Sequence, residues 1–423
     1  MTINPPTGSF DGLGIAPKIL EVLDRNKFVI PTPIQQKAIP IALEGKDLIG
    51  IAQTGTGKTL AFSVPMIQAL ASNRGQGLII LPTRELALQV DETFHRVGTS
   101  LGVKTAVLIG GMPMGRQISA LRRNPHVLIA TPGRLIDHLD SRTVRLDRVK
   151  VLVLDEADRM LDMGFAPQIN RILKDLPRDR QTMLFSATMP VEIVNIAGQH
   201  MKLPVRVEIA PSGTAAERVE QELFFVKKDA KGKLLEKILG DYRGSVLVFS
   251  RTKHGASKIA KAVKALGHES VEIHSNKSLS QRRAALDGFK TGKYRVLVAT
   301  DIAARGIDVK GIELVINYDL PESADDYVHR IGRTGRAGHE GHAISFATPE
   351  QRSEVKRIEK VIRGTLPVTP LPEGLPKTPD YTPAAFDKGR PRHSSRFRQN
   401  SGRDSKKFFG PHSGNTSHRR RYR

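Results

Sequence analysis

Short apolar runs alternate with longer segments of helical periodicity along most of the chain. In the first half these runs span residues 47–52, 77–81, 105–109, 126–130, 149–154 and 181–185. They are almost wholly apolar rather than alternating, which is typical of strands buried on both faces of a parallel sheet. Helical patterns, such as 60–71 and 84–97, lie between them. The pattern therefore predicts repeated βαβ units and a doubly wound α/β domain.

A polar stretch rich in small residues, 209–217, interrupts this rhythm, which then starts again. The second set of strand candidates spans residues 222–226, 245–249, 270–273, 296–299, 314–317 and 342–346. We therefore expect two α/β domains in tandem, at 1–208 and 219–366, with a linker at 209–218.

The last part of the chain follows neither pattern. Residues 366–383 are rich in proline, and the chain beyond Lys388 consists largely of Arg, Ser, Gly, Asn and His with four aromatic residues. Such a segment buries too little apolar surface to offset the loss of chain entropy on folding. We expect residues 367–423 to be a disordered tail.

The net charge of the chain indicates what kind of partner it binds. The net charge is +23, of which the segment from Lys388 to Arg423 carries +11, with 12 Lys or Arg and one acidic residue. This excess favours a polyanionic partner such as nucleic acid, with an anionic membrane surface as the alternative. No apolar run approaches a membrane span and the N-terminus does not resemble a signal peptide, so we expect a cytoplasmic protein without a membrane partner. The absence of cysteine excludes disulfides and Cys-ligated zinc.

The segment AQTGTGKT at 52–59 follows a buried apolar run and opens a helical pattern, as a phosphate-binding loop does. Its glycines allow close backbone approach, and consecutive N–H groups at the helix start can cradle phosphates. Lys58 can reach the β- and γ-phosphates of ATP, and Thr59 can hold Mg²⁺. The usual pattern begins with Gly where this chain has Ala52, and the alternative is a Gly/Thr-rich turn. The expected nucleotide-binding residues here are Ala52, Gln53, Thr54, Gly55, Thr56, Gly57, Lys58 and Thr59.

The segment DEAD at 155–158 directly follows the apolar run VKVLVL. Carboxylates at the C-terminal end of a central strand lie where α/β proteins bind ligands. We expect Asp155 to hold Mg²⁺ through water and Glu156 to orient or activate the attacking water. The alternative is an acidic helix N-terminus with no further role.

With its other motifs, the chain resembles a DEAD-box RNA helicase. These motifs are PTPIQ at 31–35, AQTGTGKT at 52–59, PTRELALQ at 82–89, GG at 110–111, TPGR at 131–134, DEAD at 155–158, SAT at 186–188, LVFSRT at 247–252, ATDIAARGID at 299–308 and HRIGRTGR at 329–336. The resemblance covers about residues 8–365, in the family's order. The length, the text around the motifs and the basic tail are most similar to the bacterial RhlE-like branch. The resemblance implies two RecA-like domains with ATP between them.

The resemblance also implies roles for single residues at the nucleotide. Gln35, in a motif spanning 8–36, would read the adenine edge, and Phe28 would stack on the base, although Phe28 could equally be a core residue. The family often has Gly before this aromatic, where this chain has Lys27. Phe10 matches another upstream aromatic. The remaining matches are Arg333 and Arg336 at the γ-phosphate, Asp308 at the ribose, and Ser186 and Thr188, which would couple hydrolysis to RNA binding through the DEAD segment.

For RNA, the family's contacts follow phosphates and sugars, which gives affinity without reading sequence. The matching residues are Thr83, Arg84, Gly111, Thr131, Gly133, Arg134, Arg251, Arg282, Thr300, Asp301 and Gly306. The family usually has Gln three residues before Arg282, where this chain has Leu279.

We therefore expect an ATP-dependent RNA helicase with RNA-stimulated ATP hydrolysis, ATP and Mg²⁺ as cofactors, and RNA or ribonucleoprotein and ribosomal assemblies as partners. One alternative is an ATP-gated RNA clamp or annealing chaperone acting through the basic tail. Another is a DNA-directed translocase of related fold.

Overall fold

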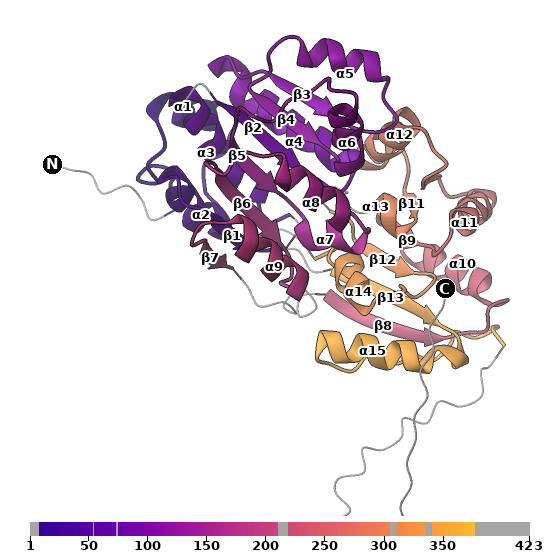
Figure 1. Ribbon diagram of the computed structural model, residues 1–423. Coiled ribbons are helices and arrows are strands. Elements are labelled where there is room, and N and C mark those ends of the chain that lie inside the picture. The colour runs from indigo at the N-terminus through magenta and orange to yellow at the C-terminus, as the bar shows by residue number, and fades with distance from the viewer. Residues whose placement is uncertain are drawn as a thin grey trace, which may run out of the picture. The chain divides into compact units, whose positions relative to one another are not determined.

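The computed structural model describes residues 8–53, 55–72, 75–209, 219–304, 309, 311–335 and 341–376. These residues all belong to one compact unit, and Figure 1 shows their helices and strands. They form two parallel sheets with helices before and after the strands. The predicted tandem of α/β domains is confirmed.

The first sheet has seven strands in the order β3-β4-β2-β5-β6-β1-β7, and every pairing is parallel. The strands are β1 (Leu48–Ile51), β2 (Gln76–Ile80), β3 (Thr105–Leu108), β4 (Val127–Ala130), β5 (Val149–Leu154), β6 (Gln181–Ser186) and β7 (Val205–Glu208). The helices are α1 (Pro17–Arg25), α2 (Pro33–Leu43), α3 (Lys58–Ser72), α4 (Arg84–Gly98), α5 (Met114–Leu121), α6 (Pro132–Asp140), α7 (Ala157–Asp162), α8 (Ala166–Lys174) and α9 (Val191–His200).

The sheet separates two hydrophobic clusters, because successive side chains of a strand point to opposite faces. Val151 and Val153 of β5 pack in the cluster formed with α1 to α4. Leu152 and Leu154 pack in the cluster formed with α6 to α9. Burial on both faces explains why the strands are continuous apolar runs in the sequence.

Strand β7 was not predicted from the sequence. It lies at the edge of the sheet, where it pairs only with β1 among the described strands. Of its four residues only Val207 is buried, so the segment VRVE carries no apolar run. An edge strand needs one covered face and one neighbour, which leaves little trace in the hydrophobic pattern.

The second sheet has six parallel strands in the order β10-β11-β9-β12-β13-β8. The strands are β8 (Val219–Phe225), β9 (Val246–Phe249), β10 (Ser270–Ile273), β11 (Val296–Ala299), β12 (Leu314–Asn317) and β13 (Gly341–Ala347). The helices are α10 (Lys231–Asp241), α11 (Lys253–Ala265), α12 (Leu279–Lys290), α13 (Asp301–Ala304), α14 (Ala324–Ile331) and α15 (Arg352–Ile362).

Residues 367–369, the start of the segment predicted to be disordered, lie along the outer edge of β8. Leu223 N–H donates to Pro367 O over 2.8 Å, and Thr369 N–H donates to Leu223 O over 2.9 Å. Leu366 is buried beside them. A proline-rich segment is tolerated at a sheet edge, and it covers backbone groups that would otherwise be open to pairing. Residues 377–423 lie outside the described part.

None of the helices within the described ranges is both long enough and apolar enough to cross a membrane.

Candidate active site

The candidate residues of the first domain gather at one edge of its sheet, because parallel strands all end on the same side. The phosphate-binding loop follows β1 and the DEAD segment follows β5. The SAT segment begins at Ser186, the last residue of β6. These three strands are neighbours in the sheet. The candidate RNA residues follow β2, β3 and β4, which are also neighbours. The boundary between the two groups lies where β2 meets β5.

The phosphate-binding loop requires its two glycines. Gly55 and Gly57 have φ values of +86° and +93°, a region that other residues rarely adopt. A Cβ atom at Gly57 would also collide with the side chain of Gln35. The buried Lys58 Nζ donates to Ala52 O over 3.0 Å and lies 3.9 Å from Asp155 Oδ1. The loop therefore holds its cation beside the DEAD segment.

Gln35 connects the PTPIQ motif to this loop. Its side-chain oxygen accepts from Thr32 N–H over 2.9 Å, as the third residue of α2 in a capping box. Its amide donates to Gly57 O over 2.9 Å. In the structure Gln35 therefore supports the loop, a role that the sequence did not suggest.

The aromatic residues upstream of this motif contact the protein core. Phe10 is buried in the core cluster of α1 to α4, and Phe28 is half-buried against it. The guanidinium of Arg96 lies 5.0 Å from the centre of the Phe28 ring. Lys27 has a φ of +60°, which explains physically why glycine suits the position before the aromatic.

Asp155 and Glu156 are both buried, in different electrostatic surroundings. Burial raises the pKa of Asp155 to about 6, against the opposing effect of Lys58. Burial would also raise the pKa of Glu156, but the cations of Arg159, Lys58 and Arg333 outweigh it and lower that pKa to about 2. Arg159 Nη1 lies 2.6 Å from Glu156 Oε2. Glu156 is therefore ionised at neutral pH, whereas burial makes Asp155 the weaker acid of the two.

Glu156 also has a strained backbone, with φ +51° and ψ +49° at the start of α7. Such a conformation costs about 1–3 kcal/mol in a residue other than glycine and is found mainly at functional sites. The turn takes the chain from β5 into α7 within two residues, Asp155 and Glu156.

Asp158, which the sequence did not single out, joins the DEAD segment to the SAT segment. Its Oδ2 accepts from Ala187 N–H at 3.0 Å, from Thr188 N–H at 2.8 Å and from Thr188 Oγ1 at 2.9 Å. Asp158 N–H donates to Ser186 Oγ over 3.2 Å. The structure thus brings Ser186 and Thr188 together with the last residue of the DEAD segment.

The candidate RNA residues of the first domain surround a glycine turn. Gly111 has a φ of +78°, and a Cβ there would collide with the guanidinium of Arg84. Arg134 Nη1 donates to Met112 O over 2.9 Å. Thr83 and Thr131 are the buried N-cap residues of α4 and α6, and a Cβ at Gly133 would meet nothing within 4 Å. The structure therefore brings these six residues together.

In the second domain, Asp301 lies against a cation that the sequence did not single out. Arg330 is 2 % exposed, and its Nη2 donates to Asp301 Oδ2 over 2.7 Å. The same guanidinium donates to Asn317 Oδ1. Thr300 directly precedes Asp301 at the end of β11. Arg251, after β9, donates from its backbone to Asp319 Oδ2 over 3.1 Å.

Arg282 has a protein partner. Its Nε lies 2.9 Å from Glu85 Oε1, and both residues are buried. Glu85 directly follows Arg84, so this pair joins α12 to the start of α4.

Arg333 Nε donates to His329 O over 3.2 Å. The remaining predicted site residues, Thr54, Gly306, Asp308 and Arg336, lie outside the described residues.

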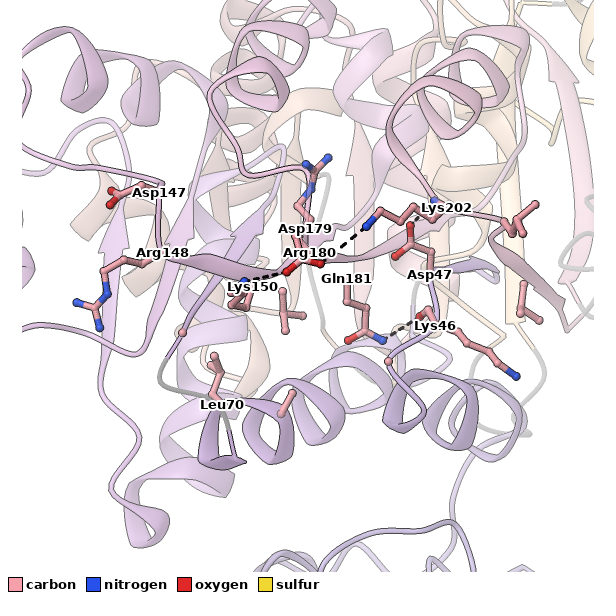
Figure 2. Close-up of a pocket in the computed structure, with 16 residues that line it drawn as sticks. Lys46, Asp47, Leu70, Asp147, Arg148, Lys150, Asp179, Arg180, Gln181 and Lys202 are labelled. Atoms are coloured by element: carbon pink, nitrogen blue, oxygen red, sulfur yellow. Dashed lines mark hydrogen bonds and ion pairs between the residues drawn. The ribbon is translucent and has the colours of Figure 1, made fainter.

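A hollow of about 1020 Å³ opens at the opposite edge of the first sheet (Figure 2). Its lining includes Asp47, Lys150 and Gln181, which stand at the amino ends of β1, β5 and β6. Lys150 and Lys202 both pair with Asp179, at 3.1 and 3.9 Å (Figure 2). The hollow therefore lies apart from every candidate site residue named above.

Comparison with known proteins agrees with this geometry. The family model for DEAD/DEAH box helicases matches residues 32–196, and the model for the helicase conserved C-terminal domain matches residues 230–338. The chain is 44 % identical to the ATP-dependent rRNA helicase RRP3 of Debaryomyces hansenii, over 86 % of the chain and 77 % of the relative. It is 45 % identical to the ATP-dependent RNA helicase CshA of Listeria monocytogenes, over 84 % of the chain and 69 % of the relative.

Solved structures are similar as well. Dbp5 of S. cerevisiae bound to RNA and ADP BeF3 matches with a TM-score of 0.78 and 32 % identity, over 86 % of this chain and 96 % of that one. Mss116p bound to ssRNA and AMP-PNP matches with a TM-score of 0.77 and 28 % identity, over 84 % and 77 %. With two RecA-like domains and the full order of motifs, the chain belongs to the DEAD-box family of ATP-dependent RNA helicases.

Proposed function

We propose that this helicase hydrolyses ATP at the ends of β5, β6 and β1 and holds an RNA backbone at the ends of β2, β3 and β4. The observation that carries the proposal is Asp158, which ties the DEAD segment to the SAT segment through four hydrogen bonds. A carboxylate in that position makes the geometry beside the nucleotide depend on the geometry of β6. Because the resemblance implies a coupling role for Ser186 and Thr188, this link would carry the effect of RNA binding to the nucleotide site.

At the nucleotide, the loop 52–59 would cradle the phosphates with its N–H groups, and Lys58 would neutralise phosphate charge. Phe28 and Gln35 would face the base, Asp308 the ribose, and Arg333 and Arg336 the γ-phosphate. The low pKa of Glu156, about 2, makes it a weak base. We infer that Glu156 orients the attacking water by accepting a hydrogen bond, and that the water gives up its proton only as the phosphate bond breaks.

Thr59 and Asp155 fit a magnesium ion that arrives with the nucleotide. The described residues contain no cluster of three acidic or histidine side chains that could hold a metal alone. One hydroxyl and one carboxylate suit Mg²⁺, which keeps several waters and takes its other ligands from phosphates. When bound, the ion would supply positive charge to the phosphates, while Asp155 orients its waters.

For RNA, the candidate residues of both domains would contact phosphates and 2′-hydroxyls rather than base edges. In the first domain these are Thr83, Arg84, Gly111, Thr131, Gly133 and Arg134. In the second they are Arg251, Arg282, Thr300, Asp301 and Gly306. Contacts from both domains would favour a bent single strand, so a short duplex would open locally when ATP and RNA are bound together.

Reciprocal binding tests this proposal, because two ligands that favour one state must strengthen each other equally. The dissociation constant of a fluorescent oligoribonucleotide is measured with and without a non-hydrolysable ATP analogue, and that of the analogue with and without RNA. We expect both constants to fall by the same factor, about tenfold or more. Equal RNA affinity with and without the analogue would contradict the proposal. A DNA strand of equal length should compete weakly, and equal competition would favour a DNA-directed enzyme.

We also propose the domain limits 1–208, 209–218, 219–366 and 367–423. The first sheet's last strand ends at Glu208 and the second sheet's first strand begins at Val219, which supports the linker. We propose membership of the bacterial RhlE-like branch from the length and the basic tail. We also propose a cytoplasmic location, and ribonucleoprotein or ribosomal assemblies as substrates. In support of the last, the relative from Debaryomyces hansenii is named an rRNA helicase.

The net charge of +11 between Lys388 and Arg423 supports a second activity, RNA annealing by the tail. Deletion of residues 388–423 should abolish annealing of complementary strands and leave RNA-stimulated ATP hydrolysis in place. If annealing persists in the deletion variant, the tail does not carry this activity.

A further inference from the structure

A buried polar chain of side chains lies behind the glycine turn of the first domain. Within α5, whose residues are all described, Gln117 is the one buried residue, at 2 % exposure. A surface helix normally buries apolar side chains, and a buried amide is retained only where its hydrogen bonds are satisfied. The question is what Gln117 binds.

Gln117 holds both ends of the turn formed by Gly110 and Gly111. Its Nε2 donates to Ile109 O over 3.0 Å and to Met112 O over 3.1 Å. Both N–H groups of the amide are thereby used, and the two carbonyls fix which end of the amide faces them. The side chain spans the turn from behind as a bridge.

His138 supports Gln117 in turn. It is fully buried on α6, and its Nε2 lies 3.2 Å from Gln117 Oε1. Because Gln117 Oε1 can only accept, His138 Nε2 carries the proton. On the other side of the ring, Nδ1 lies 2.7 Å from Thr143 Oγ1. The chain of hydrogen bonds therefore runs from Thr143 through His138 and Gln117 to the turn.

The turn held in this way touches two of the candidate RNA residues. Arg134 donates to Met112 O, the same carbonyl that Gln117 binds. The guanidinium of Arg84 lies so close to Gly111 that a methyl group there would collide with it. A shift of the turn would therefore displace both arginines.

We propose that Gln117 and His138 are positioning residues for RNA binding, which set the turn 110–112 and through it the places of Arg84 and Arg134. The inference rests on the proposed RNA contacts of these arginines. Neither Gln117 nor His138 needs to touch RNA, since both are buried. A preset turn lowers the cost of ordering the site when RNA binds.

The test separates RNA affinity from turnover in Gln117→Met, which keeps the length of the side chain and removes both donors. ATP hydrolysis is measured against the concentration of an oligoribonucleotide. We expect the RNA concentration for half-maximal stimulation to rise about five- to tenfold, with kcat at saturating RNA and the KM for ATP changed less than about twofold. Ser119→Ala, on the exposed side of the same helix, should match the wild type.

His138→Phe is the second variant, because it keeps a ring of similar size and removes the donor to Gln117. If thermal unfolding shows that Gln117→Met does not fold, the same rise in the half-maximal RNA concentration is expected of His138→Phe. An unchanged half-maximal RNA concentration in a folded variant overturns the proposal, as does an equal fall in kcat. Arg134→Ala separates failure of the positioning proposal from failure of the proposed RNA contacts. If this variant also leaves RNA affinity unchanged, the proposed RNA surface itself is wrong.

Discussion

Thr188 Oγ1 donates a 2.9 Å hydrogen bond to Asp158 Oδ2, and the backbone N–H of Thr188 donates to the same oxygen over 2.8 Å. One carboxylate oxygen thus fixes the turn that follows β6 to the helix that follows β5. The two segments are far apart in sequence and adjacent in the sheet.

Replacing Thr188 by Val tests this link, because it removes the hydroxyl and keeps the side-chain shape and the backbone bond. We expect strand separation to slow by about tenfold, since one hydrogen bond to a charged group contributes about 1.5–3 kcal/mol. ATP hydrolysis at saturating RNA should fall by less than about threefold. Duplex unwinding and phosphate release are measured in the same reactions. A parallel loss of both activities would show that the hydroxyl serves the nucleotide site alone.

The left-handed backbone at Lys27 predicts a stabilising substitution. Lys27→Gly should raise the free energy of unfolding by about 1 kcal/mol relative to Lys27→Ala, because a residue with Cβ pays about 1–2 kcal/mol in this conformation. Urea denaturation measures both. The alanine variant is the matched control, since it removes the same charge. Equal stability of the two would mean that the strain is relieved elsewhere.

Gly111→Ala should weaken RNA binding by at least about tenfold, because the new methyl group displaces Arg84 and disfavours the φ of +78°. Gly115→Ala is the control, since a Cβ there meets nothing within 4 Å. Fluorescence anisotropy with a labelled oligoribonucleotide gives both affinities. If the two variants bind RNA equally well, Arg84 does not depend on the turn.

The strands could be predicted because strands buried on both faces of a parallel sheet are continuous apolar runs in the sequence. Strand β7 could not, since only Val207 of it is buried. The phosphate loop and the DEAD carboxylates are local in sequence, so their place at strand ends was predictable. The polar partners were not, because the hydrogen-bonded pairs Asp301–Arg330 and Gln117–His138 and the ion pair Arg282–Glu85 are made by tertiary packing alone.

Acid should destabilise the fold through His138. Burial, with a smaller effect of Arg134, lowers the pKa of this histidine below 6.5. Below pH 6.5 the unfolded chain therefore binds a proton that the folded chain does not, and the free energy of unfolding falls as pH falls toward the folded pKa. The slope from this group is at most about 1.4 kcal/mol per pH unit.

Chemical denaturation between pH 5.5 and pH 7.5, a window of about one unit on either side of the unfolded pKa, measures this slope. His138→Gln, which can still donate to Gln117 and does not titrate, should show a smaller loss of stability on acidification than the wild type. Identical pH dependence in the two proteins would assign the acid sensitivity to other groups.

The central claim is that bound RNA switches on ATP hydrolysis at the carboxylates after β5. The most direct measurement is the steady-state rate of phosphate release with and without single-stranded RNA, in the wild type and in Glu156→Gln. We predict that RNA raises the wild-type rate by about tenfold or more and that Glu156→Gln, like Lys58→Ala, loses this activity by about a thousandfold. A wild-type rate that is the same without RNA, or an active Glu156→Gln variant, would contradict the account.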